Sequence, residues 1–434
     1  MQSETSLGER LRQLRAAAGL TQTQLAAGRF SKEYVSQIER GKTQPTGETL
    51  QWLADRLGVD PAFLAGGISA ADRDRLEAML VREEAASEAH REDEAITAFE
   101  QVRAAIRGSV PDLEFRALMG EAWSRIAIGD LARAIEQLND ARGLAERPQS
   151  SDVDRADVLF RLGVARYKLS SISTAAALFG EALALAEASG LPCDLLRANI
   201  HGWRSRCYRA QRDWQAARED VERALELAQH VGDTRAAADA FFLASVVAER
   251  EGQWILARRY AQRAKALYEE LADRESVGRL LNNLGGLTYL LGKPEEAVAH
   301  LKEAFRVALD NGNTADAGQF VSSLAEVYLG IGDLDSAEKH ARHALELLAD
   351  RVDYLREVGT AQLTLGKALL AKDHLKGAEE SLRAADRSFE QLSSASHRAA
   401  AWVAIGDLAA KRGDDRESAR WYRRAAEALQ DFRF

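Results

Sequence analysis

The sequence has few of the residues that interrupt helices or build special sites. Its 434 residues include 6 prolines, 3 methionines and 2 cysteines. A low proline count removes the main interruption to helices, and the abundant alanine, leucine, arginine and glutamate favour helix throughout. Cys193 and Cys207 are too few for a tetrahedral metal cage, so we expect two free, buried thiols in a reducing cytoplasm.

Long apolar runs and catalytic motifs are also missing. No run of about 18 apolar residues occurs, so no membrane-spanning helix is expected. The polar start, MQSETSLGERL, is unlike a signal peptide, and we expect a cytoplasmic protein. There is no P-loop, no GxGxxG after a strand, no HExxH and no Ser-His-Asp pattern. His340 and His343 have no acidic partner pattern and are expected to be surface residues. We therefore predict no metal, no cofactor and no enzyme activity.

Negative charge is concentrated outside the N-terminal region. The formal net charge is −9, but residues 1–66 contain eight lysines and arginines against seven aspartates and glutamates, a net of +1. The remaining chain therefore carries −10. Such a distribution allows local binding to DNA, while the acidic remainder repels DNA and limits non-specific binding.

Residues 19–47, GLTQTQLAAGRFSKEYVSQIERGKTQPTG, predict two short helices, a tight turn between them and an exit loop. Thr21 and Gln24 form a capping box at the first helix, and Ser31 caps the second. Val35 and Ile38 are three residues apart and therefore face the core together. The outward-facing residues, which suit a helix that reads base edges in a major groove, are Lys32, Glu33, Ser36 and Gln37.

Residues 7–64 resemble the Xre/Cro-type helix-turn-helix domain of phage repressors and many bacterial regulators. The resemblance is carried by LGERLRQLRAAAGLTQTQLA, SKEYVSQIERGKTQPT and LQWLADRLGVDPAFLAGG, in this order. It implies a double-stranded DNA operator as partner and an ion pair between Arg15 and Glu39; the alternative is two solvated charges. The turn is one residue shorter than in the family, and we expect Phe30 to fill its apolar slot. The candidates for phosphate contacts are Gln22, Tyr34, Lys42 and Thr43.

From about residue 112 the sequence repeats at intervals of 40 to 42 residues. The marker is an alanine in the second helix of each unit, with another alanine seven residues later. Twelve residues before the first alanine lies a small residue, as at Gly163, Gly285 and Gly366. In the last unit the turn at residues 412–415 is expected to hold one extra residue. The alanine pairs are Ala134 and Ala141, Ala175 and Ala182, Ala217 and Ala224, Ala257 and Ala264, Ala297 and Ala304, Ala337 and Ala344, Ala378 and Ala385, and Ala419 and Ala426.

These units resemble tetratricopeptide repeats, although the period is near 40 rather than 34 residues and the terminal proline is absent. We therefore predict an all-α protein with three parts. Residues 1–67 form a five-helix helix-turn-helix domain. Residues 68–111 form a helical linker or a degenerate first repeat, the latter being favoured because Ala95 aligns with the repeats. Residues 112–434 form about eight repeats, an α-solenoid wound as a right-handed superhelix with a concave inner surface.

The first helix of each repeat is expected to line that inner surface with polar and aromatic side chains. Asparagine amides both donate and accept, as binding to the backbone of an extended peptide requires. The alternative is a solvent-filled groove without a ligand. Asn283, which precedes the packing glycine, is a candidate for a structural role. The candidate ligand-binding residues are Asn199, Arg206, Arg209, Asp239, Glu249, Asn282, Tyr289, Gln319, Ser322 and Glu326, accompanied by Phe242 and Arg279.

A helix-turn-helix domain followed by tetratricopeptide repeats resembles the peptide-pheromone receptors of the Rgg- and PlcR-like family. The resemblance implies a transcription regulator whose repeats bind a short signalling peptide in quorum sensing and form a homodimer. Two alternatives stay open. In one, the repeats of a DNA-binding regulator are a docking scaffold for another protein. In the other, the protein is a non-regulatory adaptor without a specific DNA site.

Overall fold

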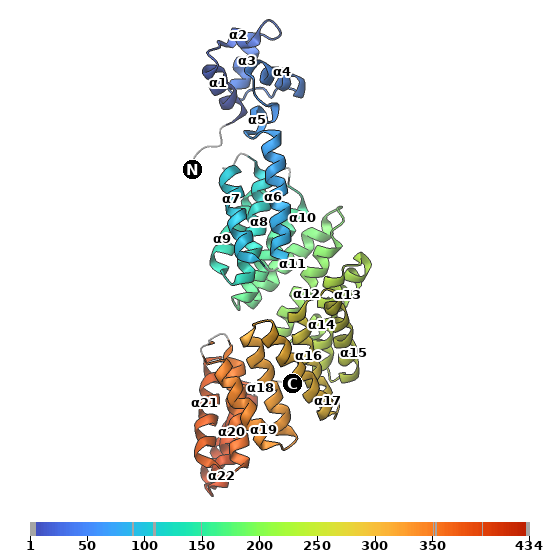
Figure 1. Cartoon of the computed structure of the whole chain (residues 1–434), viewed down its shortest axis with the longest axis vertical. Coiled ribbons are helices and arrows are strands. Elements are labelled where there is room, and N and C mark those ends of the chain that lie inside the picture. Colours follow the sequence, from blue (N-terminus) through green and yellow to red (C-terminus); the bar gives the residue numbers. More distant parts are fainter. Residues whose placement is uncertain are drawn as a thin grey trace. The chain divides into compact units, whose positions relative to one another are not determined.

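The computed structural model describes residues 6–88, 91–106, 110–148, 150–349, 351, 354–392 and 394–430 (Figure 1). These residues form helices joined by turns, with no strand among them, which confirms the all-α prediction. The chain divides into two compact units, Met1–Arg212 and Asp213–Phe434.

The first five helices form a small domain around one apolar core. The predicted caps are present: Thr21 and Gln24 form a capping box, and the Ser31 side chain accepts a hydrogen bond from the backbone of Tyr34. Leu11 and Leu25 are fully buried in this core. The helices are α1 (Leu7–Ala17), α2 (Gln22–Ala26), α3 (Lys32–Glu39), α4 (Gly47–Leu57) and α5 (Pro61–Gly66).

The rest of the first unit consists of helices that pack in chain order. Helices α6 and α7 share a core in which Leu80, Ala95 and Phe99 are fully buried. Helices α8 to α12 pack around a second core centred on Phe179. The helices are α6 (Ala70–Glu88), α7 (Glu92–Ile106), α8 (Pro111–Ile128), α9 (Leu131–Ala145), α10 (Asp152–Lys168), α11 (Ile172–Ala188) and α12 (Asp194–Ala210).

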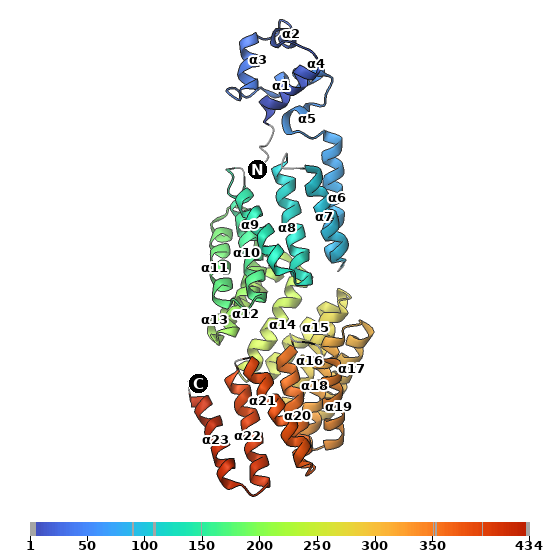
Figure 2. The same ribbon diagram turned by 90° about the vertical axis from the view of Figure 1, so that its left-hand side faces the viewer.

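The second unit continues the same pattern of antiparallel helix pairs. Neighbouring helices from α13 to α23 pack against one another, and α20 to α23 can be followed side by side in Figure 2. The helices are α13 (Trp214–Val231), α14 (Thr234–Arg250), α15 (Trp254–Glu270), α16 (Arg274–Leu290), α17 (Pro294–Asp310), α18 (Thr314–Gly330), α19 (Leu334–Leu347), α20 (Leu355–Ala371), α21 (Leu375–Gln391), α22 (Ala395–Lys411) and α23 (Asp415–Gln430).

The two helices of a repeat cross where the first helix has a small residue. A Cβ atom added at Gly285 would lie 2.5 Å from Cγ of Leu301, so only glycine permits this distance between α16 and α17. Gly163 lies in the same way against Phe179, and Gly366 against Leu382. The marker alanines are buried in every repeat from the one containing Ala134 to the one containing Ala385, which confirms the repeat.

The predicted alignment of the last repeat is wrong. Ala419 and Ala426 are exposed, whereas Ser418 and Ala425 are buried. Ser418 lies forty residues after Ala378, and the turn between α22 and α23 has three residues, as does the turn between α20 and α21. No extra residue is therefore present. The error arose because two exposed alanines have the right spacing, while a serine occupies the first buried position.

The repeats bury their apolar side chains at contacts between helices and do not gather them in one long apolar segment. Among the described residues, no helix has both the length and the apolar content that crossing a bilayer requires.

We predict opposite effects of alanine at two adjacent glycines. Gly285→Ala should destabilise the chain by about 1–3 kcal/mol, because its new methyl group overpacks the crossing with α17. Gly286 is exposed, with nothing within 4 Å of an added Cβ, so Gly286→Ala should stabilise α16 by roughly 0.5–1 kcal/mol. Denaturant unfolding of the full chain measures both, and equal effects at the two positions would refute the crossing.

Candidate functional site

Helix α3 has an apolar side in the core and a polar side in solvent. Val35 and Ile38 are at most 1% exposed. The opposite side carries the residues predicted to read bases: Lys32, Glu33 and Gln37 are exposed, and Ser36 is half-buried. The fold therefore leaves the polar side of this short helix open to a partner.

The last residue of α3 is joined to both preceding helices. Nε of Arg15 lies 2.6 Å from Oε1 of Glu39, which confirms the predicted ion pair. The hydrogen bond that Arg15 donates to Glu39 raises the pKa of the Arg15 guanidinium. Gln22 also donates from Nε2 to Oε2 of Glu39 at 2.8 Å. Because the Glu39 side chain is only 4% exposed, solvent screens these interactions weakly. The Gln22 amide, predicted to meet phosphate, is thus engaged inside the domain.

Close packing against α1 also holds the end of α3. A Cβ atom at Gly8 would lie 2.6 Å from the carbonyl oxygens of Ile38 and Glu39, so α1 approaches α3 only because residue 8 is glycine.

The turn before α3 is filled by an aromatic ring. Phe30 packs edge-on against Trp52, with ring centroids 5.2 Å apart, and its ring centroid lies 5.4 Å from that of Tyr34. Phe30 is half-buried against the core of the domain and fills the apolar slot of the turn, as predicted. Tyr34, a predicted phosphate contact, is half-buried and packs against the same core.

The exit loop brings one predicted phosphate contact back to α3. Thr43 donates from Oγ1 to Oε1 of Gln37 at 3.2 Å. Gly41 adopts φ +67° and turns the chain, and Lys42 is exposed. The loop therefore presents Lys42 to a partner but directs the Thr43 hydroxyl at Gln37.

Three predicted ligand-binding residues lie on α12 in the first unit. Asn199 is half-buried. Arg206 lies over the ring of Trp203, 4.5 Å from its centroid, and its buried Nε has no hydrogen-bond partner among the described residues. Arg209 is half-buried on the same helix.

Several candidates in the second unit bind other parts of the array. Asp239 accepts a hydrogen bond from the Tyr268 hydroxyl. Asn283 donates to Glu249 at 3.4 Å, and burial raises the pKa of Glu249. These side chains therefore connect successive helices.

Three further candidates also have neighbours inside the array. The Tyr289 hydroxyl lies so close to Gly330 that a Cβ atom there would collide with it. Arg279 pairs with Asp316 at 3.1 Å and with Glu275. Phe242 is half-buried beside the core of α14 to α16. Asn282 differs, because its buried Oδ1 has no hydrogen-bond partner in the described part of the chain.

The remaining three candidates meet in one cavity of about 240 Å³ formed by three successive first helices, α18, α20 and α22. The Ser322 side chain is 3% exposed, and its Oγ has no hydrogen-bond partner among the described residues. Glu326 is exposed, yet desolvation by the surrounding protein raises its pKa, opposed by Lys367 and Arg356. The lining residues are Gln319, Ser322, Ser323, Glu326, Arg356, Glu357, Thr360 and His397.

Known proteins resemble this chain in two separate regions. Residues 6–65 match the model of the helix-turn-helix domain, and residues 237–310 match that of the tetratricopeptide repeat. The chain therefore contains an N-terminal helix-turn-helix domain and tetratricopeptide repeats. It is 44% identical over 63 residues to the HTH-type transcriptional regulator DdrOP3 of Deinococcus deserti, a match covering 14% of this chain and 49% of that regulator. Over 135 residues it is 28% identical to the immunity repressor protein of Bacillus phage phi105, covering 31% of this chain and 84% of the repressor.

The fold as a whole resembles a solved structure. The apo form of the quorum sensor NprR from B. thuringiensis superposes with a TM-score of 0.60 at 15% identity, covering 82% of this chain and 99% of NprR. At this identity the likeness establishes the shared arrangement of helices.

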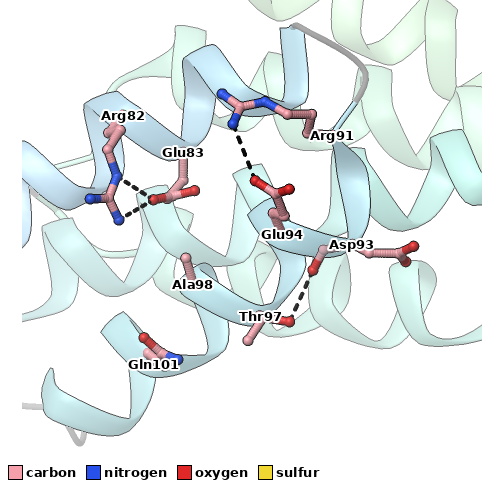
Figure 3. Close-up of a pocket in the computed structure, with 8 residues that line it drawn as sticks. All are labelled: Arg82, Glu83, Arg91, Asp93, Glu94, Thr97, Ala98 and Gln101. Carbon is pink, nitrogen blue, oxygen red and sulfur yellow. Dashed lines mark hydrogen bonds and ion pairs between the residues drawn. The ribbon is translucent and has the colours of Figure 1, made fainter.

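A larger cavity, about 710 Å³, lies beside α6 and α7, and four of its five charged side chains are paired with one another (Figure 3). Arg82 donates to Glu83 at 2.7 Å, and Arg91 donates to Glu94 at 3.2 Å. The Thr97 hydroxyl donates to the backbone of the same helix. The cavity in the tetratricopeptide repeats is the better candidate for a ligand, because its lining includes the buried Ser322 Oγ, which has no hydrogen-bond partner among the described residues.

The two cysteines are buried thiols outside any disulfide, as predicted. Desolvation raises the pKa of Cys193. Within the described ranges, no group of three or more His, Cys, Asp and Glu side chains is placed to hold a metal ion.

Sequence reasoning missed the part of the cavity contributed by α20 and α22. Thr360 lies one repeat after Gln319, so extending the same period beyond residue 326 would have found it. Nδ1 of His397 forms a hydrogen bond with Oγ of Ser394 at 2.6 Å, and desolvation lowers the pKa of His397. No repeat signal marks His397 or Arg356, because neither occupies the periodic positions.

We predict opposite effects when two glutamates of the repeats are neutralised. The raised pKa of Glu326 means that the folded state binds its proton more tightly than the unfolded state, so unfolding becomes easier as pH rises. Glu326→Gln should therefore raise the unfolding temperature at pH 7. Glu338 has a lowered pKa because Lys372 and Arg342 donate to it, so Glu338→Gln should lower the unfolding temperature.

The pH dependence separates these two effects. The gain from Glu326→Gln should vanish below about pH 4.3, the ordinary pKa of glutamate, because both states are then protonated. The loss from Glu338→Gln should persist to lower pH, since its folded pKa lies below the ordinary value. Thermal unfolding of the full chain from pH 3 to pH 8 measures both. A stabilising role for the Glu326 charge would appear as a lower unfolding temperature of Glu326→Gln at pH 7.

Proposed function

We propose that the protein is a sequence-specific transcription regulator that binds a double-stranded DNA operator through α3. The observation that carries the proposal is the partly buried Arg15–Glu39 pair, which holds the end of α3 while the polar side of this helix stays exposed. A helix that reads bases needs this combination of a fixed backbone and free hydrogen-bonding side chains. The similarity of the chain to a phage repressor and to DdrOP3 supports the same function.

The three parts of the chain then have distinct roles. Residues 1–67 bind DNA, residues 112–434 sense a ligand, and residues 68–111 connect them, in a cytoplasmic homodimer. One reading helix covers only a few base pairs, and a two-fold dimer doubles the contacts. We therefore expect two half-sites about 34–36 Å apart, or a multiple of that spacing.

The repeats are proposed to bind a short signalling peptide on the inner side of their first helices. Ser322 and Asn282 support this role, because each has a buried polar atom without a hydrogen-bond partner in the described chain. Gln319 and Glu326 add an amide and a carboxylate beside Ser322. The shared fold with a quorum sensor is consistent with a sensing role.

We predict that base contacts and phosphate contacts respond differently to mutation. Gln37→Ala and Ser36→Ala should change the preferred sequence, because a base contact discriminates by about 1–3 kcal/mol. Lys42→Ala should weaken binding to all duplexes alike and lower the salt slope by about one. Selection from random duplexes identifies the operator and its half-site spacing, and titrations of operator and altered operator across a salt series compare the variants.

Equal losses for operator and altered operator in Gln37→Ala would contradict the orientation of α3. A single asymmetric half-site bound by a monomer would contradict the proposed dimer.

We predict that substitutions on the inner face of the repeats weaken ligand binding without lowering the stability of the fold. Ser322→Ala and Asn282→Ala should each weaken peptide binding by roughly 1–3 kcal/mol, because a peptide loses a buried partner. Unfolding temperatures should stay unchanged or rise, since each variant removes a buried polar atom that lacks a partner within the described protein. The readout is DNA affinity in the presence of cell-derived peptide extract, with the exposed Gln262→Ala as control.

Two results together would favour the docking-scaffold alternative over the peptide proposal. One is that no peptide extract changes the DNA affinity of the parent protein. The other is that a protein partner co-purifies with the parent and is lost with Ser322→Ala.

A further inference from the structure

Gln37 does not present its whole amide to a partner. Its Oε1 accepts a hydrogen bond from the Thr43 hydroxyl at 3.2 Å. A glutamine amide has an acceptor end and a donor end, and this contact turns the acceptor end toward the exit loop. The Nε2 group, which carries two hydrogens, is left for whatever lies against α3.

The exit loop holds Thr43 in place by contacts that are independent of its side chain. The backbone N–H groups of Gly41 and Lys42 donate to the carbonyl oxygens of Ile38 and Gln37, each at 2.9 Å. Gly41 supplies the positive φ that this turn requires. Because the loop is hydrogen-bonded to the last turn of α3, the distance between Thr43 and Gln37 is set by the backbone.

We propose that Thr43 is a positioning residue that makes Gln37 a donor-only contact, which selects guanine over adenine at the base pair it meets. This inference rests on the proposed DNA-binding function. In the major groove, guanine presents two acceptors, N7 and O6, whereas adenine presents the N7 acceptor and the N6 donor. The usual bidentate contact of glutamine with adenine needs the amide oxygen to face the base, and here the hydrogen bond from Thr43 turns that oxygen toward the exit loop.

The test is selection from random duplexes with full-length protein, comparing wild type, Gln37→Ala, Thr43→Val and Thr43→Ser. Gln37→Ala identifies the base position that Gln37 reads, because the preference disappears there and nowhere else. At this position wild type should favour guanine over adenine by about fivefold or more, the lower range for a base-specific contact.

The two threonine variants separate positioning from packing. Thr43→Val keeps the shape but removes the hydroxyl, so the guanine-to-adenine ratio should fall toward about one as the amide oxygen becomes free to accept from adenine N6. Thr43→Ser keeps the hydroxyl and should restore the guanine preference. Unfolding temperatures of the full chain check that the variants are folded.

Three results would overturn the inference. One is a wild-type preference for adenine, thymine or cytosine at the Gln37 position. Another is an unchanged ratio in Thr43→Val. The third is a uniform loss of affinity in Thr43→Val, which would make Thr43 a phosphate contact. In each case DNA selection still succeeds, so the proposed function survives. If wild type enriches no duplex at all, the proposed function fails and the inference fails with it.

Discussion

The array depends on one contact that recurs in its helix pairs: a residue without a bulky side chain in the first helix lies against a larger side chain of the second. Gly285 meets Leu301, Gly366 meets Leu382 and Gly406 meets Tyr422, each at a distance that a Cβ atom would not allow. Because this crossing fixes where the two helices meet, it also fixes which residues of the first helix face inward. Residues one period apart, such as Gln319 and Thr360, therefore line the same cavity.

The N-terminal domain positions its functional helix by a different means. Its helices are short, so packing area alone provides little orientation, and α3 is instead fixed by Gly8, Arg15 and Gln22 at its end. A buried ion pair contributes less to stability than its Coulomb attraction suggests, because both charges lose hydration. Its clearer contribution here is geometric, since it holds the end of the helix that carries Ser36 and Gln37.

The inner face of the repeats shows how one set of positions serves two purposes. Asp239 binds Tyr268 and Glu249 binds Asn283, so these polar residues connect neighbouring helices. Ser322 and Asn282 occupy the same kind of position, but each has a buried polar atom without a hydrogen-bond partner in the described structure. A polar residue at an inward position is therefore not by itself a ligand contact, and the distinction depends on what the next repeat supplies.

The sequence alone determined the helices, their caps, the repeat and the polar side of α3, because these depend on residues close together in the chain. Thr21, Ser31 and the marker alanines are examples. The Arg15–Glu39 pair was predicted only through family resemblance. The structure alone decided that Ser418 rather than Ala419 is buried, that His397 joins Glu326 in one cavity, and that Thr43 engages Gln37. These contacts depend on how helices cross and where loops return, and residue type or spacing does not determine either.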